Sequence, residues 1–443
     1  MRRRLHGEDP WDARDIWATG RRDFWFFLLP EKKQRMRMPV IDLEGYMDPS
    51  SFCTHHLSFD AFKFLCNSME GIKINPDEGT MSQLAQSTLQ PLQGQTRLEM
   101  LPAELLGAIF ELLKIEEFMS FALCSQSLWS HAIMWIKGSY IQWKNKYSWV
   151  NTPIICTVAG GLRVLPKALQ HTLPEPTSED MERESEQAGR RYGTLTTRAS
   201  IWFNGSVHSY EKVPFPYDCL YEEAFLKQFE GAAIPDRLHS TLKACLPRLN
   251  LEPGSGWLLR NLTDQEYIRM EAVVTSDDEA TISLPGRQWL TLDILLLWLI
   301  SWKGDNKKNR KKAWSWEQLE TFEGFTDKDL SDASQGPLFG PMRSDFWPIW
   351  AGPWASHRLD VVTEKSLDND WKDRTENITR LAPKMLRVFY GRSLATQKEN
   401  RDYWEEAFRQ GGDHWEFRQS SPFLSEDLDV DWNKTKERLS QIK

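Results

Sequence analysis

The feature that most constrains the fold is the stretch from Leu101 to Trp129, LPAELLGAIFELLKIEEFMSFALCSQSLW. A Leu-Pro pair followed by Glu104 is typical of a helix start, because proline is tolerated in the first turn and a carboxylate there interacts favourably with the helix dipole. The periodicity predicts a helix to about Leu113 with two apolar rows side by side. One row is enough to attach a helix to its own core, so the second row requires another surface.

The two apolar rows lie about 100° apart around the helix axis. One row contains Leu105, Ile109 and Leu113, and the other contains Leu106, Phe110 and again Leu113. Two further helices are expected, with the apolar positions Phe118, Phe121, Ala122 and Leu123 in the first and Leu128, Trp129, Ile133 and Ile136 in the second. Because about 40 residues is the lower limit for an independent core, we expect this unit to pack against another surface.

The complete spacing over the three helices resembles an F-box. The matching residues are Leu101-Pro102-x-Glu104-Leu105-Leu106-x-x-Ile109-Phe110-x-x-Leu113 and Glu117-Phe118-x-x-Phe121-x-Leu123-Cys124-Ser125-x-Ser127-Leu128-Trp129. An F-box binds the Skp adaptor of cullin-based ubiquitin ligases. The resemblance implies an adaptor-binding surface made by Leu101, Pro102, Leu105, Leu106, Ile109, Phe110, Leu113 and Phe118. The alternative is a helical subdomain whose apolar rows pack only on the same chain.

Four later segments extend the resemblance. Residues 149–162, 257–273, 350–362 and 371–378 are together similar to an F-box family of filamentous fungi, whose C-terminal region is otherwise uncharacterised. The resemblance covers about residues 98 to 380. The chain differs from the family at two places where the family usually has glycine: residues 151–153 are Asn-Thr-Pro, and residue 356 is Ser356.

The chain as a whole is expected to have an α+β fold, with a small three-helix F-box module followed by a non-repetitive mixed α+β domain. Residues 1–96 show weak periodicity and are interpreted as a poorly structured or peripheral extension, and residues 98–148 as the F-box. The break at residues 151–153 opens a client-binding domain over residues 150–390, in which the charged segment 172–191 is a solvated loop. Residues 391–443 are expected to form a partly helical tail.

Composition excludes several classes of protein. A formal net charge of −8 argues against a protein that mainly binds nucleic acid, because such proteins present a basic surface to the phosphates. The six cysteines lie far apart without a C-x-x-C pair, so we expect reduced thiols in the cytoplasm, the nucleus or both, and no metal or other cofactor. The apolar run 290–302 is interrupted by Asp293 and is shorter than the roughly 20 residues of a membrane span, so no membrane partner is expected.

Two further segments give local predictions. Thr263 to Glu266 read as a capping box, which predicts a helix start ahead of Tyr267, Ile268 and Met270. The run from Leu292 to Trp302 is continuously apolar apart from Asp293, so its period does not distinguish a buried strand from a buried helix.

The most site-like cluster outside the F-box is the segment 354–360. His357 and Asp360 could act as a base and its orienting acid, but the sequence places no nucleophile or metal ligand set beside them. A structural histidine and an Arg-Asp pair that braces the sheet are the favoured interpretation. The candidates for client binding are Trp350, Trp354, His357 and Arg358, because tryptophan and arginine are enriched at interface hot spots.

The sequence therefore predicts a non-catalytic substrate-recognition subunit of a Skp–cullin–F-box ubiquitin ligase, which binds the adaptor and, through it, cullin, together with an unknown protein client. An alternative is a scaffold or nucleic-acid-associated protein that uses the tryptophan-rich domain and the basic run 307–312. If this alternative is wrong, the basic run is interpreted as a nuclear import signal or as a solvated loop. A third hypothesis, an enzyme built around His357, requires a deep polar cleft.

Overall fold

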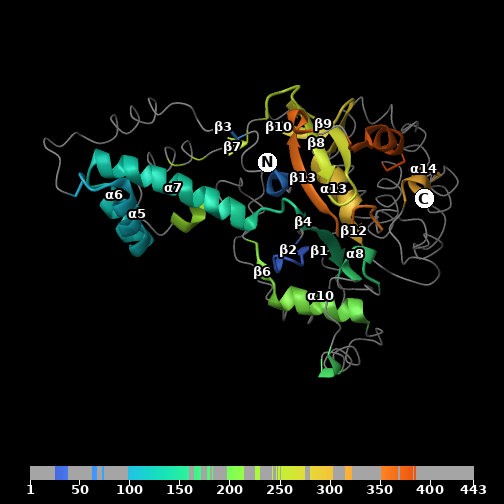
Figure 1. Ribbon diagram of the computed structural model, residues 1–443, viewed down its shortest axis with the longest axis horizontal. Coiled ribbons are helices and arrows are strands. Elements are labelled where there is room, and N and C mark those ends of the chain that lie inside the picture. Colours follow the sequence, from blue (N-terminus) through green and yellow to red (C-terminus); the bar gives the residue numbers. More distant parts are fainter. Residues whose placement is uncertain are drawn as a thin grey trace, which may run out of the picture. The chain divides into compact units, whose positions relative to one another are not determined.

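The computed structural model describes the residues 25–37, 62–66, 72–73, 98–158, 164–170, 177–179, 182, 197–213, 225–229, 242, 246, 248–249, 251–274, 280–302, 315–321, 351–367, 370–382 and 384–385. The fold is α+β, as predicted (Figure 1). The chain divides into a smaller unit of residues 1–7, 63–148 and 214–250 and a larger unit of residues 8–62, 149–213 and 251–443.

Three helices form the centre of the smaller unit, and all three were predicted. They are α5 (Ala103–Leu112), α6 (Ile115–Ala122) and α7 (Gln126–Tyr147). The first turn of α5 is closed by the carbonyl of Pro102, which accepts the N–H groups of Leu105 and Leu106. Helix α7 begins at Ser125, whose hydroxyl accepts the N–H of Leu128 at 3.2 Å and so satisfies an otherwise unpaired amide of the first turn.

Aromatic side chains join these helices. The ring of Phe110 lies edge-on to Phe118, Phe121 and Trp135, with centroid distances of 5.1, 6.0 and 6.2 Å. Because α5, α6 and α7 each contribute to this cluster, it fixes the three helices relative to one another.

A segment distant in sequence also packs on α7. The ring centroid of Phe225 lies 5.2 Å from that of Tyr140 and 5.9 Å from that of Trp143. The same ring contacts Phe229 of η1 (Lys227–Phe229). A short ladder between β3 (Ile72–Lys73) and β7 (Arg248–Leu249) belongs to the same unit. The predicted separation of an F-box at 98–148 from one continuous domain at 150–390 is therefore wrong, because residues 214–250 return to the smaller unit.

The first sheet of the larger unit has the strand order β12-β5-β1-β2-β6. Its strands are β1 (Trp25–Leu29), β2 (Gln34–Arg37), β5 (Ile155–Val158), β6 (Glu211–Lys212) and β12 (Ser301–Trp302). The middle strand β1 is buried along its whole length. The prediction that residues 1–96 are poorly structured or peripheral is therefore wrong for residues 25–29, where a continuous apolar run forms a strand buried on both faces, and for residues 62–66, where Phe62, Phe64 and Leu65 are buried.

The second sheet has the order β11-β10-β9-β8-β13-β4, with β14 beside β9. The strands are β4 (Thr152–Pro153), β8 (Gly256–Asn261), β9 (Glu266–Val274), β10 (Ala280–Leu284), β11 (Arg287–Thr291), β13 (Arg358–Thr363) and β14 (Lys372–Asp373). The predicted helix after Thr263 is wrong. The side-chain oxygen of Asn261 accepts the N–H groups of Thr263 and Asp264, and Gln265 has φ 54°, so these residues form the turn between β8 and β9.

The ambiguous run 292–302 is mostly helical. Helix α13 (Leu292–Ile300) begins where the hydroxyl of Thr291 accepts the N–H of Ile294, and all nine of its residues are buried. Other helices of this unit include α8 (Lys167–Gln170), α10 (Arg198–Ser209), α14 (Trp316–Thr321) and η4 (Glu364–Ser366). In the sequence, α3 (Phe62–Leu65) spans the division between the two units. No helix in the described part of the chain has both the length and the apolarity to span a bilayer.

Several predictions concern residues that the structure leaves undescribed. These are the basic run 307–312, the tail 391–443, Trp350 and most of the loop 172–191. Of that loop, the described residues 177–179 and 182 are exposed.

Candidate functional site

Helix α5 presents one of its two apolar rows to solvent. Leu106 and Phe110 are 0% and 2% exposed, whereas Leu105 and Leu112 are 52% and 87% exposed. The two sets lie on adjacent arcs of the same helix, since each residue advances the direction by about 100°. The helix therefore uses one row for its own core and leaves the other uncovered.

The uncovered row is continuous with the residues that precede and follow it. Pro102 and Met100 are exposed, and the partly exposed residues are Leu101, Ile109 and Leu113. We call this surface the α5 apolar face, made by Met100, Leu101, Pro102, Leu105, Ile109, Leu112 and Leu113. Large exposed apolar patches of this kind mark sites of interaction.

The structure divides the predicted adaptor-binding residues into two groups. Leu101, Pro102, Leu105, Ile109 and Leu113 reach the surface. Leu106, Phe110 and Phe118 do not, so their prediction as direct contacts is wrong; they form the core that holds the helices together.

Leu112 and Met100 were missed. Leu112 follows Leu105 by seven residues, so two helical turns place it on the same side of α5. This spacing is visible in the sequence, but the predicted rows contain Leu113 and not Leu112.

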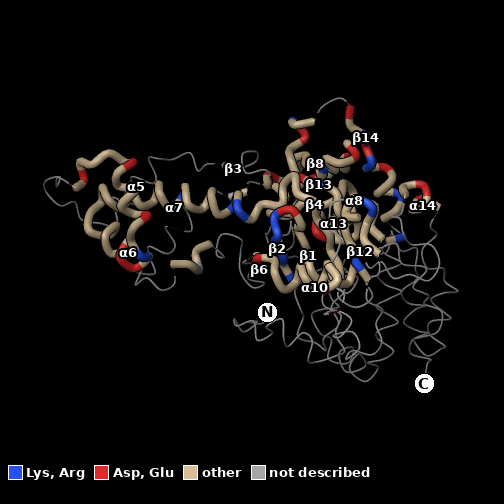
Figure 2. Tube along the Cα trace, turned by 60° about the horizontal axis from the view of Figure 1, so that its bottom comes forward, with Lys and Arg blue, Asp and Glu red and all other residues tan. Residues whose placement is uncertain are grey.

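Exposed acidic residues lie on α5, beside the α5 apolar face, and on α6. They are Glu104 and Glu111 on α5 and Glu116 and Glu117 on α6. Figure 2 shows the acidic positions of these two helices in red. The carboxylate of Glu117 accepts the backbone N–H of Lys114 at 3.1 Å and caps α6. Glu104 and Glu111 make no hydrogen bond or ion pair within the described residues.

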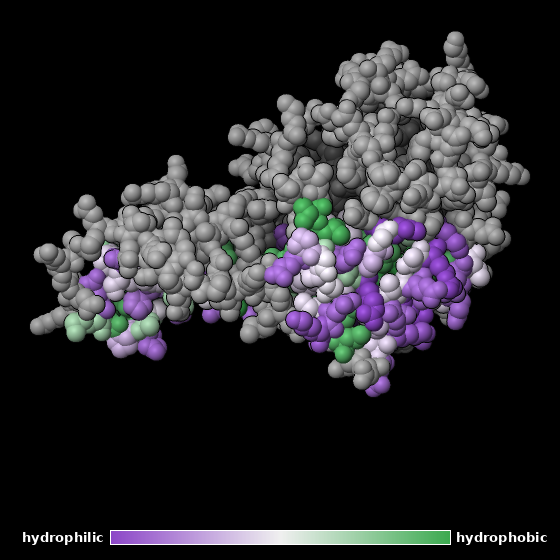
Figure 3. Space-filling model, turned by 90° about the horizontal axis from the view of Figure 1, so that it is seen from above, coloured by the Kyte–Doolittle hydropathy of each residue, from purple (hydrophilic) through white to green (hydrophobic). Residues whose placement is uncertain are grey.

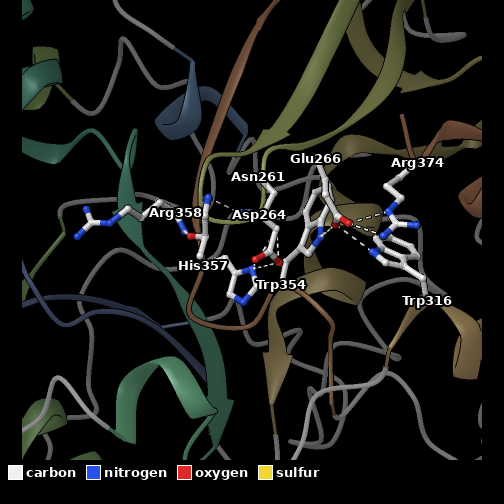
Figure 4. Close-up of polar contacts among 9 residues, drawn as sticks. Asn261, Asp264, Glu266, Trp316, Trp354, His357, Arg358 and Arg374 are labelled. Atoms are coloured by element: carbon white, nitrogen blue, oxygen red, sulfur yellow. Dashed lines mark hydrogen bonds and ion pairs between the residues drawn. The ribbon is translucent and has the colours of Figure 1, made fainter. Parts of the chain in front are cut away.

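The second candidate site is the polar cluster around residues 354–358 in the larger unit (Figure 4). Its centre is the buried carboxylate of Glu266 on β9. This carboxylate accepts the indole N–H groups of Trp316 at 2.9 Å and Trp354 at 3.1 Å, and the Nε–H of Arg374 at 2.8 Å. These three donors occupy both oxygens of the Glu266 carboxylate. Glu266 therefore connects β9, α14 and the loop before β13, and its role in the cluster is structural.

Trp354 cannot contact a client directly, because its side chain is fully buried. The prediction for this residue is wrong, and its role in the structure is to pack and to donate to Glu266. Of the four predicted client-binding residues, His357 and Arg358 reach the surface in part.

His357 faces the turn between β8 and β9. Its Nδ1 lies 3.0 Å from the Nδ2 of Asn261 and 3.3 Å from the Oδ2 of Asp264. Because the oxygen of Asn261 accepts two backbone N–H groups, its amide nitrogen is the donor that faces the carboxylate of Asp264, at 3.4 Å, beside the ring. The hydrogen bond from His357 holds the pKa of Asp264 below its usual value, although partial burial opposes the shift. The contact fixes the turn to the start of β13.

The expected arginine–aspartate pair exists, but its arginine is Arg260. Arg260 on β8 donates from Nε and Nη2 to the carboxylate of Asp360 at 2.9 and 2.6 Å, and from Nη1 to the carbonyl of Ser366 at 3.0 Å. Its guanidinium also lies 5.1 Å from the ring of Trp371. Both oxygens of Asp360 therefore bind Arg260 within the sheet. The carboxylate that faces His357 belongs to Asp264.

Arg358 joins two other parts of the larger unit. It donates to the carbonyl of Asn151 at 2.7 Å and pairs with Glu31, which lies in the turn between β1 and β2. The partly exposed guanidinium therefore links β13 to the first sheet.

The loop before β13 contains one residue with an unfavourable backbone. Ser356 has φ 69° and is buried, and its hydroxyl makes no hydrogen bond within the described structure. A positive φ of this kind favours glycine, which has no β-carbon to clash. Gly352 in the same loop is required for another reason, because a β-carbon would lie 2.3 Å from the carbonyl oxygen of Leu299.

The hydroxyl of Ser356, the residue before His357, makes no hydrogen bond to the imidazole within the described structure. Within the described ranges, no group of three or more histidine, cysteine or carboxylate side chains is arranged to hold a metal ion. Comparison of the chain with protein-family models, with curated proteins and with solved structures finds no match. Of the two candidate sites, the α5 apolar face is therefore the one whose exposed apolar side chains most clearly lack a covering surface.

Proposed function

We propose that this chain is a non-catalytic substrate-recognition subunit of a Skp–cullin–F-box ubiquitin ligase, which binds the Skp adaptor through the α5 apolar face. One observation carries the proposal: Leu105 and Leu112 are exposed beside a fully buried row on the same helix. Exposed leucines gain free energy when a partner covers them, at about 25 cal/mol for each Å² of apolar surface. The F-box-like spacing supports the adaptor as that partner.

The larger unit is proposed to bind a protein client. His357 and Arg358 support this assignment, since both are partly exposed and lie next to each other at the start of β13. The subunit would act by raising the effective concentration of client lysines near the ligase.

The test is co-purification with the Skp adaptor, followed by an affinity measurement on the Leu105→Asp/Leu112→Asp double variant. We expect affinity to fall about 30-fold or more, which corresponds to a hot-spot loss of at least ~2 kcal/mol, because two carboxylates would be buried without partners. Both positions are exposed, so the variant should keep the helix content and melting temperature of the unmodified chain.

Met134→Asp is the matched control. Met134 on α7 is 60% exposed, so the change is the same in kind but lies on another helix of the same unit. It should bind the adaptor normally. Adaptor binding that survives in the double variant, or that is lost equally in the control, would contradict the assignment of the α5 apolar face.

A further inference from the structure

The carboxylates beside the α5 apolar face are arranged on one side of it. Glu104 and Glu111 are seven residues apart, so they lie above one another on α5, about 100° from Leu105. On the opposite side the face is bounded by the buried residues Leu106 and Phe110. The exposed surface therefore has one acidic edge and one edge closed by its own core.

Helix formation does not account for both carboxylates. Glu104 lies in the first turn, where a negative charge is favourable, but Glu111 lies in the last turn, where the helix dipole opposes it. Glu111 also forms no ion pair in the described part of the chain, although Lys114 follows it by three residues. The exposed carboxylate of Glu111 is therefore available to a partner on this side of the face.

The charge around the face is also one-sided. In the described residues 100–125, the acidic residues are Glu104, Glu111, Glu116 and Glu117, and the one basic residue is Lys114 (Figure 2). A partner that approached with acidic groups on this side would meet like charges, whereas basic groups would be attracted and oriented.

We infer that the partner of the α5 apolar face is a protein whose apolar groove carries lysine or arginine side chains along one edge, opposite Glu104 and Glu111. The apolar row supplies most of the binding free energy, and the acidic edge selects the orientation of the partner and speeds association. This inference rests on the proposed function, because it describes the adaptor surface that would cover the same face.

The test measures adaptor binding by the Glu104→Lys/Glu111→Lys variant at about 50 mM and about 500 mM NaCl, where electrostatic screening differs strongly. We expect roughly tenfold weaker binding at low salt, mainly through a slower association rate, and a difference that largely disappears at high salt. Glu104→Gln/Glu111→Gln should show a smaller loss in the same direction.

A matched control separates local charge from net charge. Glu179→Lys/Glu182→Lys makes the same change in net charge at two exposed positions of the larger unit, far in sequence from α5, and should leave the association rate unchanged. Equal or tighter binding by the charge-reversed variant at low salt would overturn the inference while leaving the proposed function intact, provided that the Leu105→Asp/Leu112→Asp variant loses binding. No binding by the unmodified chain would overturn both.

Discussion

Helices α5 and α13 both consist mainly of apolar residues, but their surroundings differ. All nine residues of α13 are buried, whereas α5 buries Leu106 and Phe110 and exposes leucines on the adjacent row. On the face seen in Figure 3, the described residues of the larger unit are mainly hydrophilic, with a few hydrophobic patches. The difference shows that apolar content alone does not indicate whether a helix serves the core or a partner.

The largest expected effect tests this contrast directly. Trp298→Ala in α13 should lower the free energy of unfolding by about 3–5 kcal/mol, because it removes a fully buried ring and leaves a cavity. Leu112→Ala in α5 should change it by less than about 0.5 kcal/mol, since that side chain is already in water. Urea unfolding followed by circular dichroism measures both. A cost of several kcal/mol for Leu112→Ala would show that the α5 apolar face is covered within the chain.

The sequence predicted the three central helices of the smaller unit because their signals are local. Pro102 opens α5, Ser125 caps α7, and the apolar spacing fixes which residues of each helix can share a face. It assigned residues of both rows to the adaptor surface, because the burial of the second row depends on where Phe118 and Trp135 pack against Phe110. For this reason Phe110 was predicted at the interface and Leu112 was not.

The larger unit was harder to predict because its contacts are distant in sequence. Strand β1 pairs with β5, so residues 25–28 find their partners at residues 155–158. No local pattern reveals such a pairing. The helix predicted after Thr263 is wrong because the polar residues of a capping box also suit a tight turn. The turn forms here because the side-chain oxygen of Asn261 accepts the N–H groups of Thr263 and Asp264.

The next test compares the stability contributed by a buried ion pair with that contributed by an exposed ion pair of the larger unit. Asp360→Asn should destabilise the chain by about 3 kcal/mol, because Arg260 would keep its charge in a site where the arginine and aspartate side chains are 15% and 5% exposed. Glu364→Gln breaks an exposed pair with Arg269 and should cost less than about 1 kcal/mol. Equal unfolding midpoints for the two variants would contradict the difference in burial.

Ser356→Gly should have a smaller effect of the opposite sign. Glycine removes the strain of a positive φ and a buried hydroxyl without a partner, and it loses some free energy through its greater freedom when unfolded. We expect a net stabilisation of about 1 kcal/mol. Ser356→Ala removes only the hydroxyl, so it should stabilise less than glycine. A destabilising glycine would show that the serine side chain is needed in the loop.

The smallest expected effect concerns the contact between Asp264 and His357, which ties an exposed turn to the buried sheet. The pKa of Asp264 is lowered in the folded chain, chiefly by the hydrogen bond from His357. A lowered pKa means that the carboxylate adds stability above its usual pKa of 3.8 and loses this contribution as the pH falls through the folded value.

The difference in unfolding free energy between the unmodified chain and Asp264→Asn should therefore shrink below about pH 4. We expect less than about 1 kcal/mol at pH 6, because the carboxylate is half exposed and water screens the contact. Urea unfolding at a series of pH values measures the difference. In a His357→Gln background the same substitution should lose most of its pH dependence, since the first cause of the shift is gone. A pH dependence that persists unchanged in that background would assign the shift to Asn261 or Arg374, and the turn would then be held independently of His357.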